Sequence, residues 1–98
     1  MKIIKTLTGT TLNVVLQGRL DVAAAHHLET EIRPFLDGIS ALIWDLADLE
    51  YISSAGLRLL SAAQKEMNKQ GKMTVKNANE AITEIFEMTG FTSVLTLE

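Results

Sequence analysis

The sequence predicts an α/β fold, in which a mixed sheet of four to five strands carries helices mostly on one face. Strand-like and helix-like patterns alternate along the chain, as they do in sheets built from strand–helix–strand units. Two predicted strands alternate apolar and polar residues, which indicates one packed and one solvated face. Right-handed crossovers then place successive helices on the same side. The predicted order is an N-terminal hairpin that leads into β-α-β-α-β-α.

The N-terminal hairpin is predicted from residues 2–9 and 11–20, which are joined by a turn at Gly9 to Thr11. Both segments are rich in β-branched and apolar residues and are separated by a glycine-containing turn. In the second segment apolar residues take every other position: Leu12, Val14 and Leu16. This alternation predicts a strand with one wet face.

The first helix is predicted over Val22 to Leu36. Its apolar residues recur at helical spacing: Ala25, Leu28, Ile32 and Phe35 or Leu36. Asp21 stands at the position of an N-cap. Pro34 falls inside the pattern, and we expect the last turn to kink or break there.

The middle of the chain predicts a buried strand followed by a helix. Residues 41–46 form a nearly continuous apolar run, which favours a central strand. Residues from Ser54 to Gln70 have a helical pattern that Gly71 ends.

The C-terminal part of the chain predicts a fourth strand, a third helix and a short fifth strand. Residues 72–78 alternate again, and 79–89 carry apolar residues on one helical side. Gly90 is expected to be a left-handed cap. A fifth strand is expected at 93–97.

Composition and charge narrow the class of function. The chain has 98 residues, 47% of them apolar, and we expect one domain spanning 1–98. A net charge of −3 with nine scattered Lys and Arg argues against direct binding of nucleic acid. No apolar run approaches the length of a membrane span or of a secretory signal, so we expect no membrane partner. The lack of cysteine fits a reducing compartment, and a cytoplasmic location is expected.

The stretch LEYISSAGLRLLSAAQ, from Leu49 to Gln64, places two serines between a strand and a helix. Ligand sites in open parallel sheets gather beyond the carboxyl ends of the strands, where both Asp21 and the serines are expected. A nucleophile elbow needs G-x-S-x-G, and a P-loop needs a lysine after its last glycine; this stretch has neither. His26 and His27 are adjacent, so they point about 100° apart on a helix, and they lack the spacing of a metal-binding pair. We therefore expect no catalytic residue, no metal and no cofactor.

Two interpretations of this junction remain open on the residues alone. Ser53 or Ser54 is well suited to cap the helix. Gly56 is unfavourable in a first helical turn, which suggests an open helix start whose N–H groups donate hydrogen bonds to an anion such as a phosphate on Ser54.

Three segments resemble the STAS domain, the family of bacterial anti-sigma factor antagonists. They are GRLDVAAAHHLE, LIWDLADLEYISSAGLRLL and ITEIFEMTGF, and the resemblance covers essentially the whole chain. It implies a STAS-like fold. In that family the junction typically reads Asp-Ser-Ser-Gly-Leu, and the first serine is phosphorylated. Alignment on Gly56-Leu57 puts Ser54 at the phosphorylated position, with Ser53 in place of the aspartate and Ala55 in place of the second serine; Ser53 is the alternative acceptor.

The resemblance implies an anti-sigma factor antagonist that regulates transcription and is not an enzyme. Its implied partners are an anti-sigma factor of the ATP-binding serine-kinase type and a phosphatase for the phosphorylated form. The implied partner-binding residues are Asp21, Ser53, Ser54, Ala55, Gly56, Leu57 and Arg58. The alternative is a non-phosphorylated STAS subunit of a transporter or signalling complex.

Overall fold

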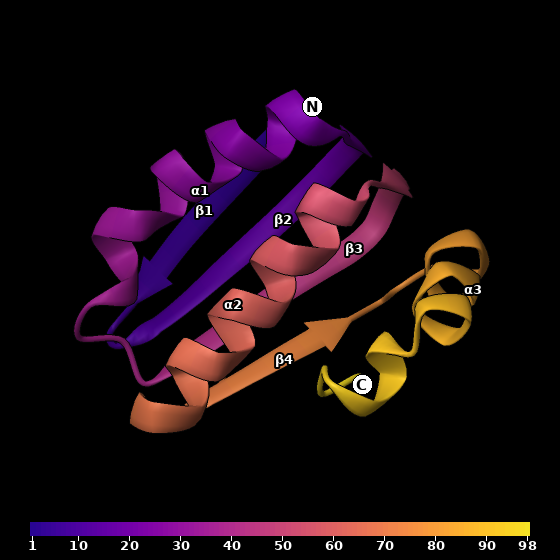
Figure 1. Ribbon diagram of the computed structural model, residues 1–98. Helices are drawn as coiled ribbons and strands as arrows, with labels where there is room; N and C mark the ends of the chain where they lie inside the picture. Colours follow the sequence, from indigo (N-terminus) through magenta and orange to yellow (C-terminus); the bar gives the residue numbers. More distant parts are fainter.

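The computed structural model describes residues 1–98 as one mixed sheet with three α-helices (Figure 1). The elements in chain order are β1 (Lys2–Thr8), β2 (Thr11–Leu20), α1 (Val22–Leu36), β3 (Ala41–Ile52), α2 (Ser54–Gln70), β4 (Lys72–Lys76) and α3 (Glu80–Thr89). A 3₁₀ turn at Phe91–Ser93 follows α3. The left-handed conformation predicted for Gly90 is present at the end of α3 (φ 77°).

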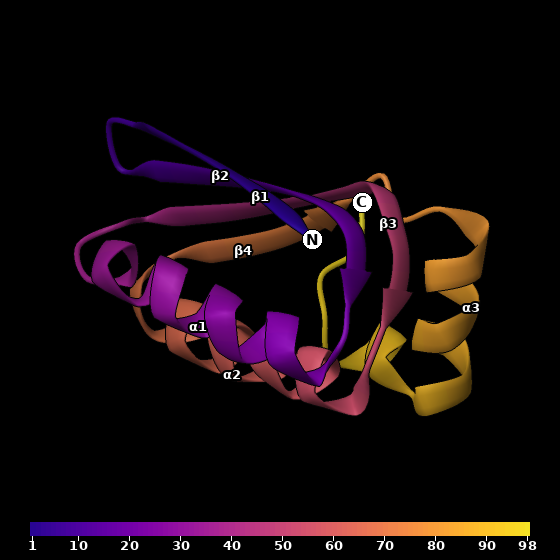
Figure 2. The same ribbon diagram turned by 90° about the horizontal axis from the view of Figure 1, so that it is seen from above.

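The sheet has the strand order β1-β2-β3-β4. β1 and β2 form the predicted antiparallel hairpin, and β2, β3 and β4 run parallel. α1 and α2 lie together on one face of the sheet, whereas α3 stands beside its end (Figure 2). The predicted mixed sheet with helices mostly on one face is therefore confirmed.

The core lies between the sheet and the α1/α2 layer. Alternate residues of the strands point into it: Leu12, Val14 and Leu16 from β2, Leu42, Trp44 and Leu46 from β3, and Met73 and Val75 from β4. Ala25, Leu28 and Ile32 of α1 are buried against them. The strand alternation and the helical spacing therefore identified the packed faces correctly.

β3 is longer than the predicted strand 41–46 and continues to Ile52. Its second half does not alternate, because Leu49 and Ile52 are buried three residues apart. The pairing register with β2 shifts twice along this half, as at β-bulges. Near the first shift, the Asp45 carboxylate accepts a hydrogen bond from the backbone N of Ala47 at 3.1 Å. The bulges carry the strand around to the start of α2.

The last turn of α1 was expected to kink or break at Pro34; it does not break, since α1 continues through Pro34 to Leu36. Tertiary contacts hold this last turn. The side-chain amide of Gln70 on α2 donates to the carbonyls of Leu36 and Ile39, at 2.6 and 2.8 Å. Phe35 and Leu36 also pack against the core.

The expected fifth strand at 93–97 is reduced to one bridge between Leu97 and Val75 of β4. The 3₁₀ turn takes up the beginning of this segment. The backbone N of Thr96 is turned toward α2, where the Gln64 side chain accepts its hydrogen bond at 3.3 Å. The segment therefore joins two elements and does not extend the sheet as a full strand.

Asn79 fastens α3 to the bulged half of β3. Its side-chain oxygen caps α3 by accepting from the N of Ile82 at 3.1 Å, and its amide nitrogen donates to the carbonyl of Leu49 at 2.7 Å. Asn79→Ala should lower the free energy of unfolding by about 1–3 kcal/mol, because it removes the cap and leaves the carbonyl without its donor. Asn79→Asp keeps the cap and loses only the donor. Urea unfolding should show both variants destabilised; an Asp variant as stable as the parent would contradict a role for the donor.

Candidate functional site

The N-termini of α1 and α2 lie side by side where β2 and β3 end (Figure 1). The backbone N of Ser53 donates to the carbonyl of Leu20 at 2.8 Å, which fixes Ser53 beside Asp21. We call Asp21 together with Ser53–Arg58 the α1/α2 tip. Both helices present their positive ends at this tip, as parallel strands with crossovers of the same hand require.

Each helix at the tip has a side-chain cap. The Asp21 carboxylate accepts from the N of Ala24 at 2.8 Å, so its predicted capping of α1 is confirmed. The Ser53 hydroxyl accepts from the N of Gly56 at 3.2 Å, which makes Ser53 the cap of α2. Ser54 is then the first helical residue.

The two serines differ in accessibility. Ser53 is only 6% exposed and its hydroxyl is used by the cap. Ser54 is exposed, and its hydroxyl makes no hydrogen bond to another side chain or to the backbone of the domain. Of the two hydroxyls, only that of Ser54 is open to an external active site.

The remaining tip residues divide into a floor and a surface. Gly56 and Leu57 are buried, so they shape the tip from beneath and offer no side-chain surface to a partner. Ala55 is half-buried and Arg58 is exposed.

The reason for Gly56 is close packing, and not the open helix start expected from the sequence: Gly56 is buried and its N donates to the Ser53 hydroxyl. A Cβ at this position would lie 2.8 Å from Cγ1 of Ile52 and 2.9 Å from Cγ of Leu20. The first turn of α2 therefore rests directly on the ends of β3 and β2.

Gly56→Ala is expected to lower the free energy of unfolding by about 1–2 kcal/mol. The overlap with two core side chains costs about 1–3 kcal/mol, and the better helix propensity of alanine offsets part of it. Chemical denaturation measures the difference, with Ser54→Ala as the control on the exposed side of the same turn. A stabilised Gly56→Ala variant would show that the contact is loose.

The charges around Ser54 are compatible with an added negative group. The first turn of α2 contains no acidic residue. Arg58 follows four residues later, which places it next to Ser54 on the helix surface, and it takes part in no ion pair or hydrogen bond. The carboxylate of Asp21, at the same tip, already accepts a hydrogen bond from the α1 backbone.

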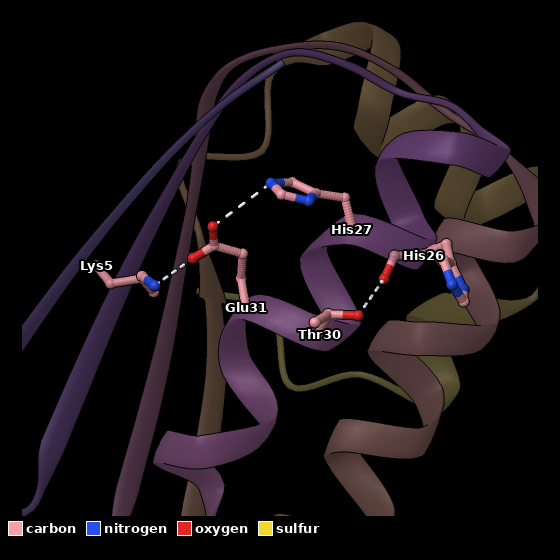
Figure 3. A network of polar contacts seen from close by, with 5 residues as sticks. All are labelled: Lys5, His26, His27, Thr30 and Glu31. Atoms are coloured by element: carbon pink, nitrogen blue, oxygen red, sulfur yellow. Dashed lines mark hydrogen bonds and ion pairs between the residues drawn. The ribbon is translucent and has the colours of Figure 1, made fainter.

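The two histidines point in different directions, as their adjacency predicts. His27 faces β1, where its Nε2 lies 3.4 Å from the Glu31 carboxylate that also binds Lys5 (Figure 3). His26 points away from that network and lines a groove with Ala55 and Arg58 of α2. Neither imidazole is hydrogen-bonded to a tip serine.

The ion pair between Lys5 and Glu31 links β1 to α1, and His27 of α1 lies beside the same carboxylate. The hydrogen bond from Lys5, and then its charge, lower the pKa of Glu31, and His27 adds a smaller effect of the same sign. A carboxyl group whose pKa is lower in the folded state stabilises the fold above its unfolded pKa, and this stabilisation is lost as the pH falls through the folded pKa.

Glu31→Gln is accordingly expected to destabilise the domain at pH 7. The difference from the parent should shrink as the pH falls below about 4.3, the ordinary pKa of glutamate. Thermal melts from pH 7 to pH 3 would measure it, with the exposed Glu84→Gln as a control whose difference stays flat. A Glu31→Gln difference that is constant with pH would contradict this coupling.

Three surface residues at or next to the tip were not singled out from the sequence. Val22 is 68% exposed, directly after Asp21 and outside the apolar stripe of α1. Arg19 lies over the ring of Tyr51, 4.4 Å from its centroid, one pair before the last paired residues of β2 and β3, Leu20 and Ile52. Val22 could have been recognised from the sequence, because it does not share the helical face of the buried residues of α1. The Arg19–Tyr51 contact could not be predicted, because it depends on the pairing register of β2 and β3, which the bulges shift.

The structure presents no metal-binding arrangement at the tip. No three His, Asp or Glu side chains are grouped so that they could hold an ion. None of the helices is both long enough and apolar enough to cross a membrane.

The family follows from the whole chain. Residues 2–98 match the model of the STAS domain, and the chain belongs to this family. Among curated relatives, BtrV of Bordetella bronchiseptica, a candidate anti-sigma factor antagonist, is 37% identical over 81 residues, which are 81% of this chain and 70% of BtrV. The anti-sigma-B factor antagonist of Bacillus subtilis is 27% identical over 85 residues, which are 86% of this chain and 78% of that protein.

The fold is also that of solved anti-sigma factor antagonists. The unphosphorylated form of SpoIIAA has a TM-score of 0.85 at 18% identity and aligns with 99% of this chain and 88% of its own. The phosphorylated form of SpoIIAA, a Bacillus cell fate determinant, has a TM-score of 0.78 at 19% identity and aligns with 99% of this chain and 91% of its own. At these identities the likeness establishes the fold.

Proposed function

We propose that this protein is an anti-sigma factor antagonist whose binding surface is switched by phosphorylation of Ser54. In the unmodified form the α1/α2 tip docks an anti-sigma factor of the ATP-binding serine-kinase type, and the sigma factor held by that partner is released to direct transcription. The protein acts in the cytoplasm as a binding module and contributes no catalytic group. The names of its curated relatives support the antagonist role.

The modification is a phosphoryl transfer to the Ser54 hydroxyl. The kinase supplies ATP and magnesium; a bond forms between the serine oxygen and the γ-phosphorus, and the bond between that phosphorus and the β,γ-bridging oxygen breaks, giving ADP. The hydroxyl proton is taken up by the kinase or by water. A phosphatase restores the serine by hydrolysis.

A single observation carries the choice of acceptor. Ser54 is the exposed first residue of α2, and its hydroxyl makes no hydrogen bond, whereas Ser53 is buried and its hydroxyl caps the helix. A phosphate on the first turn of a helix is favoured by the helix dipole and by free backbone N–H groups.

The proposal is tested by incubating the protein with ATP, magnesium and the anti-sigma kinase of its own cell and measuring the intact mass. We expect the gain of one phosphate, retained in Ser53→Ala and lost in Ser54→Ala. A gain that persists in Ser54→Ala would move the acceptor elsewhere. No gain by the parent protein would support the non-phosphorylated STAS subunit instead.

A further inference from the structure

A groove runs between α1 and α2 and begins at the tip. Its first part is a hollow of about 360 Å³ whose floor and sides are largely apolar, including Val22, Ala25, Ala55 and Leu59. A second hollow continues it along the same two helices and shares Glu29, Leu59 and Ala62 with the first. We call the two hollows together the helix groove.

The small residues of α2 open this groove. Ala55 and Ala62 stand on the α1 side of α2, where larger side chains would fill the space between the helices. At about 360 Å³, the hollow at the tip has room for a side chain from a partner.

The groove has an unpaired cation at its tip end. Arg58 lies on the α2 wall and has no acidic partner, whereas the one carboxylate of this hollow, Glu29, is already paired with Arg33 one turn along α1. His26 adds a second nitrogen-bearing side chain on the α1 wall. The chemistry that complements this end is a carboxylate next to an apolar side chain.

Arg58 is also placed to meet a modified Ser54. Residues four apart on a helix face each other across one turn, with Cβ atoms about 5–6 Å apart. A guanidinium binds phosphate oxygens more strongly than it binds a neutral group, and it does so in a two-pronged geometry. The same side chain therefore has two competing anions within reach.

We infer that Arg58 is an exchange contact: it binds a carboxylate of a partner segment seated in the helix groove while Ser54 is bare, and it turns to the phosphoryl group once Ser54 is modified. This inference rests on the proposed function and extends it. Phosphorylation then acts twice, because it adds a charge to the interface and withdraws the cation that the partner needs. The occupant of the groove is a segment of the anti-sigma kinase with an acidic residue beside an apolar one.

The intramolecular half of the inference is tested without any kinase. Phosphoserine is installed at position 54 during synthesis, and the second phosphate ionisation is followed by ³¹P NMR. With Arg58 present, its pKa should be lower by about half a pH unit than in Arg58→Gln, and Arg58→Lys should restore part of the difference. Lys65→Gln, an exposed cation on α2 outside the groove, should change nothing. The same pKa with and without Arg58 overturns the exchange.

The intermolecular half uses the kinase that modifies Ser54 in the mass measurement. Arg58→Glu should weaken its binding to the unmodified protein by about tenfold or more, and Lys65→Glu, with the same change of charge, by less than about twofold. In an Arg58→Gln background, Ser54→Asp should cause a smaller loss of binding than in the parent. If Ser54→Asp weakens binding and the Arg58 variants bind like the parent, this inference fails alone. If Ser54→Asp itself binds like the parent, the proposed function fails.

Discussion

Ser54→Asp is expected to weaken binding of the anti-sigma kinase by about 10²- to 10³-fold and to leave the domain folded. The two effects have different causes. Within the domain, the new carboxylate lies at the positive end of α2, where a negative charge contributes about 0.3–1 kcal/mol of stability. The first turn of α2 contains no acid that would repel it.

In the complex that we propose, the same charge is buried against a surface that fits a hydroxyl. An unpaired buried charge costs about 3–5 kcal/mol, and each 1.4 kcal/mol weakens binding tenfold. The loss of affinity follows from these two figures. Titration calorimetry and a thermal melt measure both properties on one sample.

Ser54→Asn is the matched control for this variant, because it has the same shape without the charge. It should bind within about tenfold of the parent, since a buried neutral amide costs far less than a buried charge. An Asp variant that binds like the Asn variant would show that charge is not what the partner rejects. An Asp variant that unfolds would place the effect in the domain and not in the interface.

Gly71→Ala is expected to cause the largest loss of stability among single methyl additions. A Cβ on Gly71 would lie 2.0 Å from the carbonyl oxygen of Ser40. This carbonyl cannot move freely, because it accepts a hydrogen bond from the backbone N of Lys72 at 3.0 Å. The backbone N of Ser40 also donates to the carbonyl of Thr10 at 2.8 Å. The backbone between α1 and β3 must therefore shift.

The expected loss is about 3 kcal/mol or more, which corresponds to a melting temperature lower by about 12 °C or more for a domain of this size. Gly38→Ala is the control, because its Cβ would have no atom within 4 Å and only its left-handed φ of 89° opposes the change. It should cost about 1–2 kcal/mol. Equal losses in the two variants would contradict the close approach at Gly71.

The sequence correctly predicted the elements in which the apolar spacing and the capping residues indicate the same bounds. β2, α1 and α2 have the predicted bounds, because their apolar spacing is regular and a capping residue precedes each helix. The second half of β3 was missed because bulges break the alternation that defines a strand in sequence. The turn at Pro34 and the C-terminal segment depend on Gln70 and Gln64, which lie far away along the chain.

The sequence predicted that Asp21 and the serines lie at neighbouring strand ends, and it predicted the capping role of Asp21, which the structure confirms. That Ser54 is the phosphate acceptor was implied by the resemblance and stays a prediction. Which serine caps α2 depended on backbone geometry that puts Ser53 under the first turn. The reason for Gly56 depended on Leu20 and Ile52, two strand ends brought together by the register of β2 and β3. The place of His26 in the groove wall could not be predicted either, because it depends on how α1 packs against α2.

The phosphorylated protein itself gives the most direct test of the switch. A phosphoryl group brings a charge of about −1.5 to −2 to Ser54. The dissociation constant for the anti-sigma kinase should rise by about 10²- to 10³-fold when position 54 carries phosphoserine, and the melting temperature should stay within a few degrees of the unmodified form. An unchanged dissociation constant would contradict the account.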